Sequence, residues 1–222
     1  DYVYEDAEPD YQEKVSECER EIERLLMQYA AQVDAGKADK LARTKKRSTY
    51  KNAPDIDIEK YAYALWGVNL MAMPGMGTGA LMQLIGELGH DFTSKFETCE
   101  KFCKWCNLSP NNKITGGKLI SSHIPRRKNP VGQILRLCAN TVKDEKSEMG
   151  AYFRRMKSKD GYIQAIVATA HKMARIIYTM VKNRQEYNPK LVGCSEKELL
   201  ERKIARTQRQ LQILNEKLGN VA

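Results

Sequence analysis

The chain has 222 residues and a formal net charge of +9 at pH 7, and this length suits one domain with additional helices. It contains no run of about eighteen apolar residues, which excludes a transmembrane helix, and its acidic start at residues 1–14 is unlike a signal peptide. We therefore expect a cytoplasmic protein without a membrane partner.

The first predicted element is a long coiled-coil helix within residues 1–48. Its apolar side chains recur at steps of three and four, the spacing of a coiled-coil seam, at Val15, Cys18, Ile22, Leu25 and Tyr29. We expect either the same helix of a second chain or a returning helix of this chain to cover the seam. Residues 49–57 are predicted to be a linker, because Pro54 disfavours helix at the residue before it.

Residues 58–190 are predicted to form the main domain. Apolar periodicity indicates helices at 58–72, 78–89, 95–106, 130–156 and 162–184. A β-hairpin is expected from Asn112 to Ser122, with its turn at Gly116-Gly117. A final helix is expected within residues 191–222 after the N-cap Ser195, and it carries a second coiled-coil seam. Because both terminal helices need partners, we expect self-association.

The positive charge is concentrated in one segment. Residues 101–143 contain nine Lys or Arg residues and neither Asp nor Glu, whereas acids and bases balance over the rest of the chain. A cluster of this kind attracts polyanions and releases their counterions on binding, so it predicts a nucleic acid as partner. The cations expected to contact phosphates are Lys113, Lys118, Arg126, Arg127, Lys128 and Arg136.

A glycine-rich loop precedes this segment. Residues 73–79 read Met-Pro-Gly-Met-Gly-Thr-Gly between two predicted helices, which resembles the helix-hairpin-helix element of DNA-binding proteins. Gly75 and Gly77 allow a tight turn, and backbone N–H groups at Thr78 and Gly79 can then bind a phosphate. An ordinary turn is the alternative. The expected fold is mainly α: a helical domain with a helix-hairpin-helix element and a short hairpin, flanked by coiled-coil helices.

The predicted hairpin turn places a hydroxyl beside two glycines and a lysine, at Thr115-Gly116-Gly117-Lys118. This set suits nucleophilic attack on a phosphodiester, because glycines allow close approach and lysine stabilises developing negative charge. A Gly-Gly turn with a solvated lysine is the alternative interpretation. Three cysteines at helical spacing, Cys99, Cys103 and Cys106, are interpreted as buried thiols, and we expect no metal site.

Several motifs agree in order and spacing with a known family. Residues 73–77 (Met-Pro-Gly-Met-Gly), 105–110 (Trp-Cys-Asn-Leu-Ser-Pro) and 115–118 (Thr-Gly-Gly-Lys) resemble the C-terminal transposase domain of the insertion sequence 110 family, and the likeness continues through 151–157 and 168–175. These enzymes are similar to the Piv invertases and are bridge-RNA-guided recombinases. The resemblance covers roughly residues 56 to 190.

The resemblance implies a DNA recombinase with a structured guide RNA, assembled as a dimer or a tetramer and associated with a prokaryotic nucleoid. A serine before the glycine forms a covalent link to DNA in this family, so the resemblance assigns the nucleophile to Thr115. Ser121 and Ser122 are rivals nearby in sequence. The family's N-terminal nuclease-like domain binds magnesium through four acidic residues.

Two departures from the family pattern affect the expected activity. Only an acidic stub precedes the first coiled coil, so magnesium is expected in a separate N-terminal domain and this chain alone is expected to be inactive. Threonine stands at the serine position, where its methyl group stiffens the rotamer and crowds attack. A catalytically inert module for nucleic-acid binding and oligomerisation is therefore the alternative function.

Overall fold

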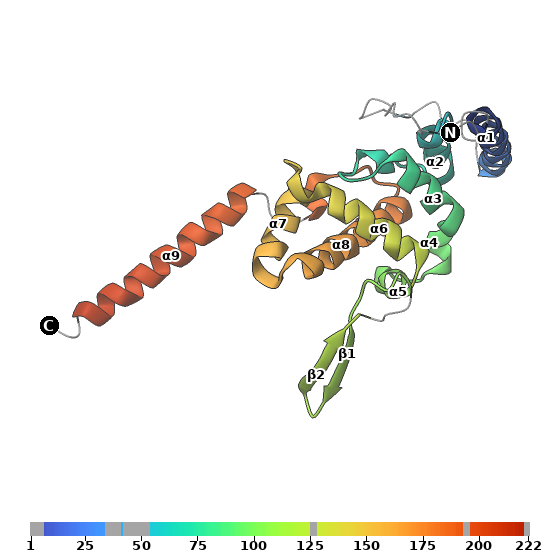
Figure 1. Ribbon diagram of the computed structural model, residues 1–222. Helices are drawn as coiled ribbons and strands as arrows, with labels where there is room; N and C mark the ends of the chain where they lie inside the picture. Colours follow the sequence, from blue (N-terminus) through green and yellow to red (C-terminus); the bar gives the residue numbers. More distant parts are fainter. Residues whose placement is uncertain (1–6, 34–40, 42–53, 125–127, 193–195, 220–222) are drawn as a thin grey trace.

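The computed structural model describes residues 7–33, 41, 54–124, 128–192 and 196–219, and it confirms a mainly helical fold (Figure 1). The first half of the chain forms α1 (Ala7–Val33), α2 (Ile58–Trp66), the 3-10 helix η2 (Leu70–Ala72), α3 (Thr78–Leu88), α4 (Phe92–Lys95) and α5 (Cys99–Trp105). A two-stranded antiparallel sheet follows, with β1 at Asn111–Thr115 and β2 at Lys118–His123.

The second half of the chain returns to helices. These are α6 (Pro130–Thr141), η3 (Val142–Asp144), α7 (Glu148–Asp160), α8 (Tyr162–Asn183), η4 (Pro189–Val192) and α9 (Glu196–Gly219). In the described residues, no helix is long and apolar enough to cross a membrane.

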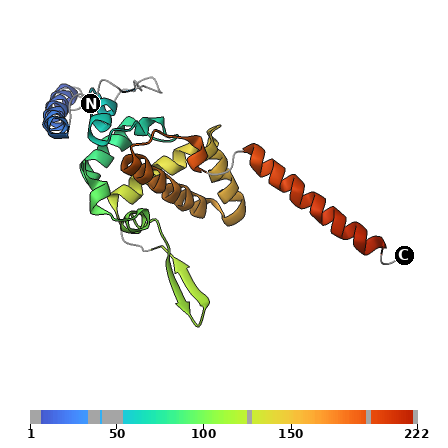
Figure 2. The same cartoon turned by 180° about the vertical axis from the view of Figure 1, so that it is seen from behind.

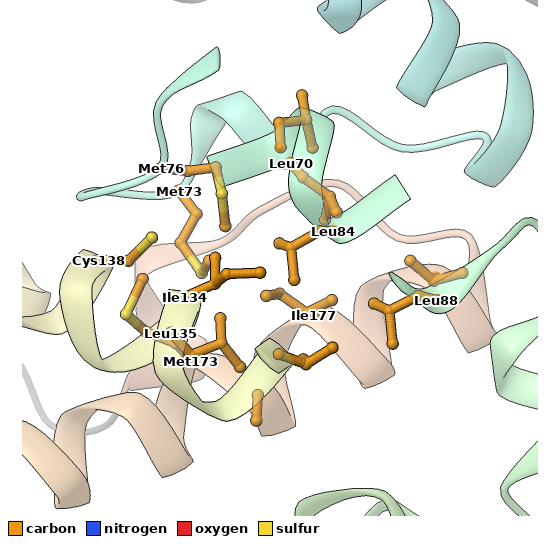
Figure 3. Packing of buried hydrophobic residues seen from close by; sticks show 14 of the residues in the cluster. Leu70, Met73, Met76, Leu84, Leu88, Ile134, Leu135, Cys138, Met173 and Ile177 are labelled. Carbon is orange, nitrogen blue, oxygen red and sulfur yellow. The ribbon is translucent and has the colours of Figure 1, made fainter. Parts of the chain in front are cut away.

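The core is built around α8. This helix packs against α5, α6 and α7, and α3 covers the other side of α6. Met173 and Ile177 of α8 lie beside Leu135 of α6 and Leu84 of α3, and the methionines of the glycine-rich loop close the cluster from above (Figure 3). Burying one large apolar side chain of this kind contributes about 1.5–3 kcal/mol, so this cluster fixes the position of the loop.

An aromatic cluster fastens α5 to α8. The ring centroids of Phe92 and Phe102 lie 5.3 Å apart, and Phe102 stacks on Tyr178 at 5.8 Å. The Tyr178 hydroxyl also donates a hydrogen bond to the Phe96 carbonyl at 2.7 Å. Since the hairpin leaves from the end of α5, this cluster sets the direction in which the hairpin projects.

Two of the predicted helices run through breaks, and a third starts too early, since the helix expected at 95–106 begins at Cys99 after the N-cap Thr98. The helix expected at 58–72 ends at Trp66, because Gly67 adopts a left-handed conformation (φ 69°) and its N–H bonds to the Tyr63 carbonyl. The helix expected at 130–156 divides into α6 and α7. A new helix begins after Ser147, whose side chain accepts a hydrogen bond from the Gly150 N–H. Apolar periodicity continues across both breaks, which is why it did not reveal them.

Helix α1 buries a different face from the predicted seam. Leu26 and Ala30 are buried and Ile22 is partly buried, and α2 is the helix that packs against them. The Tyr61 hydroxyl of α2 donates to a Glu23 carboxylate oxygen at 3.1 Å. The predicted seam residues Val15, Leu25 and Tyr29 remain exposed, so a returning helix covers α1 in part and self-association through the seam stays a prediction.

Helix α9 projects away from the helical body (Figures 1 and 2). Its seam residues Leu200, Ile204 and Leu211 are more than half exposed, at 56%, 56% and 55%. The predicted N-cap, Ser195, lies outside the described residues. A partner for this helix stays a prediction, as it does for α1.

Two helical glycines are expected to respond oppositely to alanine. A Cβ at Gly132 would lie 2.1 Å from the Cys106 carbonyl oxygen, whereas a Cβ at Gly86 would meet no atom within 4 Å. Gly132→Ala should therefore lower the free energy of unfolding by about 2 kcal/mol or more. Gly86→Ala should raise it by about 0.5–1 kcal/mol, since alanine has the higher helix propensity. Urea unfolding measures both, and equal effects would contradict this packing.

Candidate nucleic-acid interface

The glycine-rich loop is fixed against the end of α6. Gly75 adopts φ 79°, and a Cβ there would lie 2.5 Å from Val142 Cγ1 and 2.6 Å from the Cys138 carbonyl oxygen. Met73 and Met76 on either side are buried in the core. Only glycine fits this close approach at positive φ, so the loop has one conformation and α3 starts at a defined place.

The start of α3 is open to solvent. Gly77 is its N-cap residue in an extended conformation, and among the described residues no side chain caps the helix. Side chains added at Gly77 or Gly79 would meet no atom within 4 Å. There is therefore room for a ligand beside the first turn of α3, where free N–H groups and the positive end of the helix dipole favour phosphate. The helix before the loop is the single turn η2 rather than the long helix predicted.

The hairpin forms at the predicted place. Thr115 pairs with Lys118 across the turn, and Asn112 pairs with Ser122 nearer the body. Gly116 and Gly117 have φ values of 57° and 76°, the positive pair that a type I′ turn requires. A bulge between Lys113 and Ile114 interrupts the ladder, and such bulges increase the local twist of a strand pair.

The hairpin tip stands clear of the helical body (Figures 1 and 2). Residues 115–118 are all exposed. The structure therefore places the predicted nucleophile, both turn glycines and Lys118 at the end of a projecting arm, where a nucleic-acid backbone can approach from several sides.

The two rival hydroxyls already have partners. Ser121 Oγ lies 3.0 Å from His123 Nδ1, on the same face of β2. Ser122 donates to Asn112 Oδ1 at 2.8 Å across the ladder. Both serines lie closer to the helical body than Thr115 does.

The predicted cations are not equivalent. Lys113, Lys118 and Lys128 are exposed, and Arg126 and Arg127 lie outside the described residues. Arg136 is partly buried and donates a hydrogen bond to the Asn107 carbonyl at 2.7 Å. Burial lowers the pKa of its guanidinium. This side chain braces the turn before the hairpin, where Asn107 has φ 54°, and a direct contact of Arg136 with DNA stays a prediction.

Two of the three cysteines pack inward as interpreted from their spacing, whereas Cys99 is only partly buried. Cys103 and Cys106 are buried, and burial raises the pKa of Cys106 to about 12. A protonated thiol is neither a good nucleophile nor a metal ligand. Within the described ranges, no group of three or more His, Cys, Asp or Glu side chains is placed to hold a metal ion.

Sequence reasoning missed a cleft at the base of the hairpin. It has a volume of about 520 Å³, and Tyr152 of α7 and His171 of α8 line it with the root of the hairpin. On the same two helices, Arg155 lies over the Tyr152 ring, and Lys172 and Arg175 lie within electrostatic reach of His171. The signal in the sequence is a cluster of polar and basic residues at 171–175 inside an otherwise apolar helix. His171 is only partly buried.

Comparison with known proteins finds one similarity for part of this domain. Residues 68–154 match the family model described as Transposase IS116/IS110/IS902 family. The matched segment runs from the glycine-rich loop through α3, the hairpin and α6 into α7, so it contains both candidate phosphate-binding elements. No curated protein and no solved structure matches the chain. This part of the chain is therefore similar to a transposase domain, and DNA recombination is the class of function that the match supports.

The open start of α3 gives a prediction in which stability and binding change in opposite directions. Gly77→Asp and Gly77→Asn should both raise the free energy of unfolding by a few tenths of a kcal/mol (about 0.3), because each side chain caps α3. Only the aspartate should weaken duplex DNA binding, by about fivefold at low salt, since its charge repels a phosphate at the helix end. Equal DNA affinity of the wild type and both variants, measured by fluorescence anisotropy, would remove this helix end from the interface.

Proposed function

We propose that this chain binds DNA and supplies the Thr115 hydroxyl as the nucleophile for strand cleavage and exchange in insertion-sequence transposition. The observation that carries the proposal is the hairpin tip: an exposed hydroxyl, two turn glycines and a lysine project together from a segment similar to a transposase domain. Glycine leaves the turn without side chains, so a phosphodiester can reach the threonine oxygen.

The reaction at this tip is a transesterification. Thr115 Oγ attacks the phosphorus, the bond from phosphorus to the strand's leaving oxygen breaks, and the hydroxyl proton goes to a base or to solvent. The product is a covalent phosphothreonine link and a free DNA hydroxyl. Because one ester replaces another, a hydroxyl of the second DNA can reverse the step and join the strands. Lys113 and Lys118 carry the positive charge that stabilises the phosphorane oxygens.

Magnesium does not fit the residues around the hairpin. The segment 101–143 contains no Asp and no Glu, and carboxylate oxygens are the protein ligands that Mg²⁺ prefers. The proposal therefore assigns the metal to a separate acidic domain of the recombinase, and no step of this chain's chemistry passes through it.

Ser121 is the strongest rival to Thr115. Its Oγ lies within hydrogen-bond reach of His123 Nδ1, and a neutral imidazole with its proton on Nε2 accepts a proton in that geometry. Thr115 ranks first because it lies directly beside the exposed turn, whereas Ser121 lies further along β2 toward the helical body.

The assembly that we propose includes further partners. The exposed seams of α1 and α9 suit self-association into a dimer or a tetramer. The exposed cations also suit a structured guide RNA, whose backbone carries the same charge as DNA. An enzyme of this kind works at the nucleoid in the cytoplasm of a prokaryote.

A catalytically inert binding module is the second candidate function. The observation in its favour is Thr115 itself, because its β-methyl restricts the side-chain rotamer and crowds in-line attack. In that case the same tip and the start of α3 hold the DNA backbone, and another chain performs the chemistry.

Covalent trapping distinguishes the two functions. A suicide DNA substrate with an acidic nuclease-like domain supplied should give an adduct that peptide mass spectrometry assigns to Thr115. Thr115→Ser should increase the adduct, since the crowding methyl group is gone, and Thr115→Ala should abolish it. Ser121→Ala is the matched control and should retain it. An adduct on Ser121, or normal DNA retention without any adduct, would contradict the proposed nucleophile.

The salt dependence of binding tests the charge at the tip. Lys118→Gln should lower the slope of log affinity against log salt concentration by about 1, and weaken binding uniformly across DNA sequences. Lys60→Gln removes the same charge from an exposed position on α2 and should leave the slope unchanged. Identical slopes for wild type and Lys118→Gln would exclude a phosphate contact at the tip.

A further inference from the structure

The cleft at the root of the hairpin is lined by both apolar and polar side chains. Its apolar lining comes from the segment before β1, the residue after β2 and the face of α8, at Leu108, Pro110, Ile124, Ile163, Val167 and Ala168. Four polar side chains complete it, namely Ser122, Tyr152, Gln164 and His171. A flat ring with apolar faces and hydrogen-bonding edges matches this lining.

Three cations of α7 and α8 lie near two side chains that line the cleft, Tyr152 and His171. The Arg155 guanidinium lies 5.1 Å from the centroid of the Tyr152 ring. Burial lowers the pKa of the Lys172 ammonium, and the charges of Arg175 and Arg155 lower it further. These three cations therefore lie within electrostatic reach of one another. Glu100 is the acid that lies close to them, 3.9 Å from Arg175 and largely exposed.

His171 in this lining is neutral at pH 7. Burial lowers its pKa, and the charges of Arg175 and Lys172 act in the same direction. A neutral imidazole offers one donor and one acceptor, so it can pair with the polar edge of a base. The Tyr152 hydroxyl also keeps its proton, because burial raises its pKa.

We propose that this cleft binds one unstacked nucleotide of single-stranded DNA. The base lies against the apolar wall of α8 with its edge at Tyr152 and His171, and the neighbouring phosphates lie on Arg155 and Lys172. The cationic rim selects a polyanion over an apolar peptide. An apolar floor, an aromatic side chain and a positive border are the combination by which proteins hold single strands.

The position of the cleft suits a strand that the hairpin tip has opened. Ser122 lines the cleft and pairs with Asn112, three residues before Thr115. At about 3.3 Å per residue, the border of the cleft at Ser122 lies roughly 10 Å from Thr115, which is about three nucleotides of a stacked strand. The inference thus extends the proposed function, and it rests on DNA being the substrate at the tip.

The test compares the affinity for a single strand that carries bases with the affinity for a strand that lacks them. Fluorescence anisotropy of the full chain is measured with a ten-residue oligothymidylate, with an abasic strand of equal length and charge, and with a DNA duplex. Wild-type protein should prefer the oligothymidylate over the abasic strand by about tenfold, the size expected for one stacked base. Oligouridylate should bind more weakly than oligothymidylate in the same assay.

Two variants locate that preference. Ala168→Trp fills the cleft and should abolish the preference while duplex affinity stays within about twofold. Gln164→Glu is isosteric and exposed, so it should fold normally, and its charge should weaken single-strand binding by about fivefold. Gln12→Glu on exposed α1 is its control and should have no effect. Thermal unfolding confirms that each variant is folded.

Each outcome has a distinct meaning. Equal affinity for thymidylate and abasic strands, or a preference that survives both Ala168→Trp and Gln164→Glu, overturns the cleft assignment and leaves duplex binding intact. Tighter binding of oligouridylate that the cleft variants remove overturns the assignment to DNA. Loss of self-association in the cleft variants, with single-strand binding unchanged, overturns it in favour of a protein partner. Failure of every nucleic acid to bind refutes the proposed function itself.

Discussion

The close approach of α6 to the end of α5 is the constraint on which the candidate site depends. Gly132 lies so near the Cys106 carbonyl that any side chain would collide with it. One hydrogen bond crosses the same junction, and a second caps the start of α6. Arg136 donates to the Asn107 carbonyl, and the Asn129 side chain accepts from the Gly132 N–H at 2.9 Å. The hairpin leaves the body beside Asn107 and the chain returns at Asn129, so both of its ends are fixed to one packed core.

The fixed root holds this short hairpin in one position. An isolated hairpin would not keep its structure in the same way, since two strands alone are only marginally stable in water. The same core holds the glycine-rich loop through Gly75 against Val142. The helical body therefore presents two phosphate-binding elements, the start of α3 and the hairpin tip, at positions set by packing rather than by ligand.

Sequence reasoning found the parts of the site that depend on local rules. The Gly116-Gly117 turn and the start of α3 follow from glycine's access to positive φ and from apolar periodicity, and both were predicted correctly. Charge alone could not show that Arg136 and Lys118 differ in role. In the sequence, an arginine that donates a hydrogen bond to a backbone carbonyl looks the same as a lysine that is free to bind phosphate. The buried face of α1 was also missed, since α2 selects it by tertiary packing. The cleft joins three segments distant in sequence, which periodicity does not reveal.

Hydrogen exchange of the full chain with and without duplex DNA tests the central claim most directly, because it reports on the backbone amides that are proposed to meet phosphate. The account predicts slower exchange at residues 78–80 and 116–118 on DNA binding, with α1 and α9 unchanged. Protection confined to α1 or α9, with the hairpin tip and the start of α3 exchanging as fast as in the free protein, would contradict it.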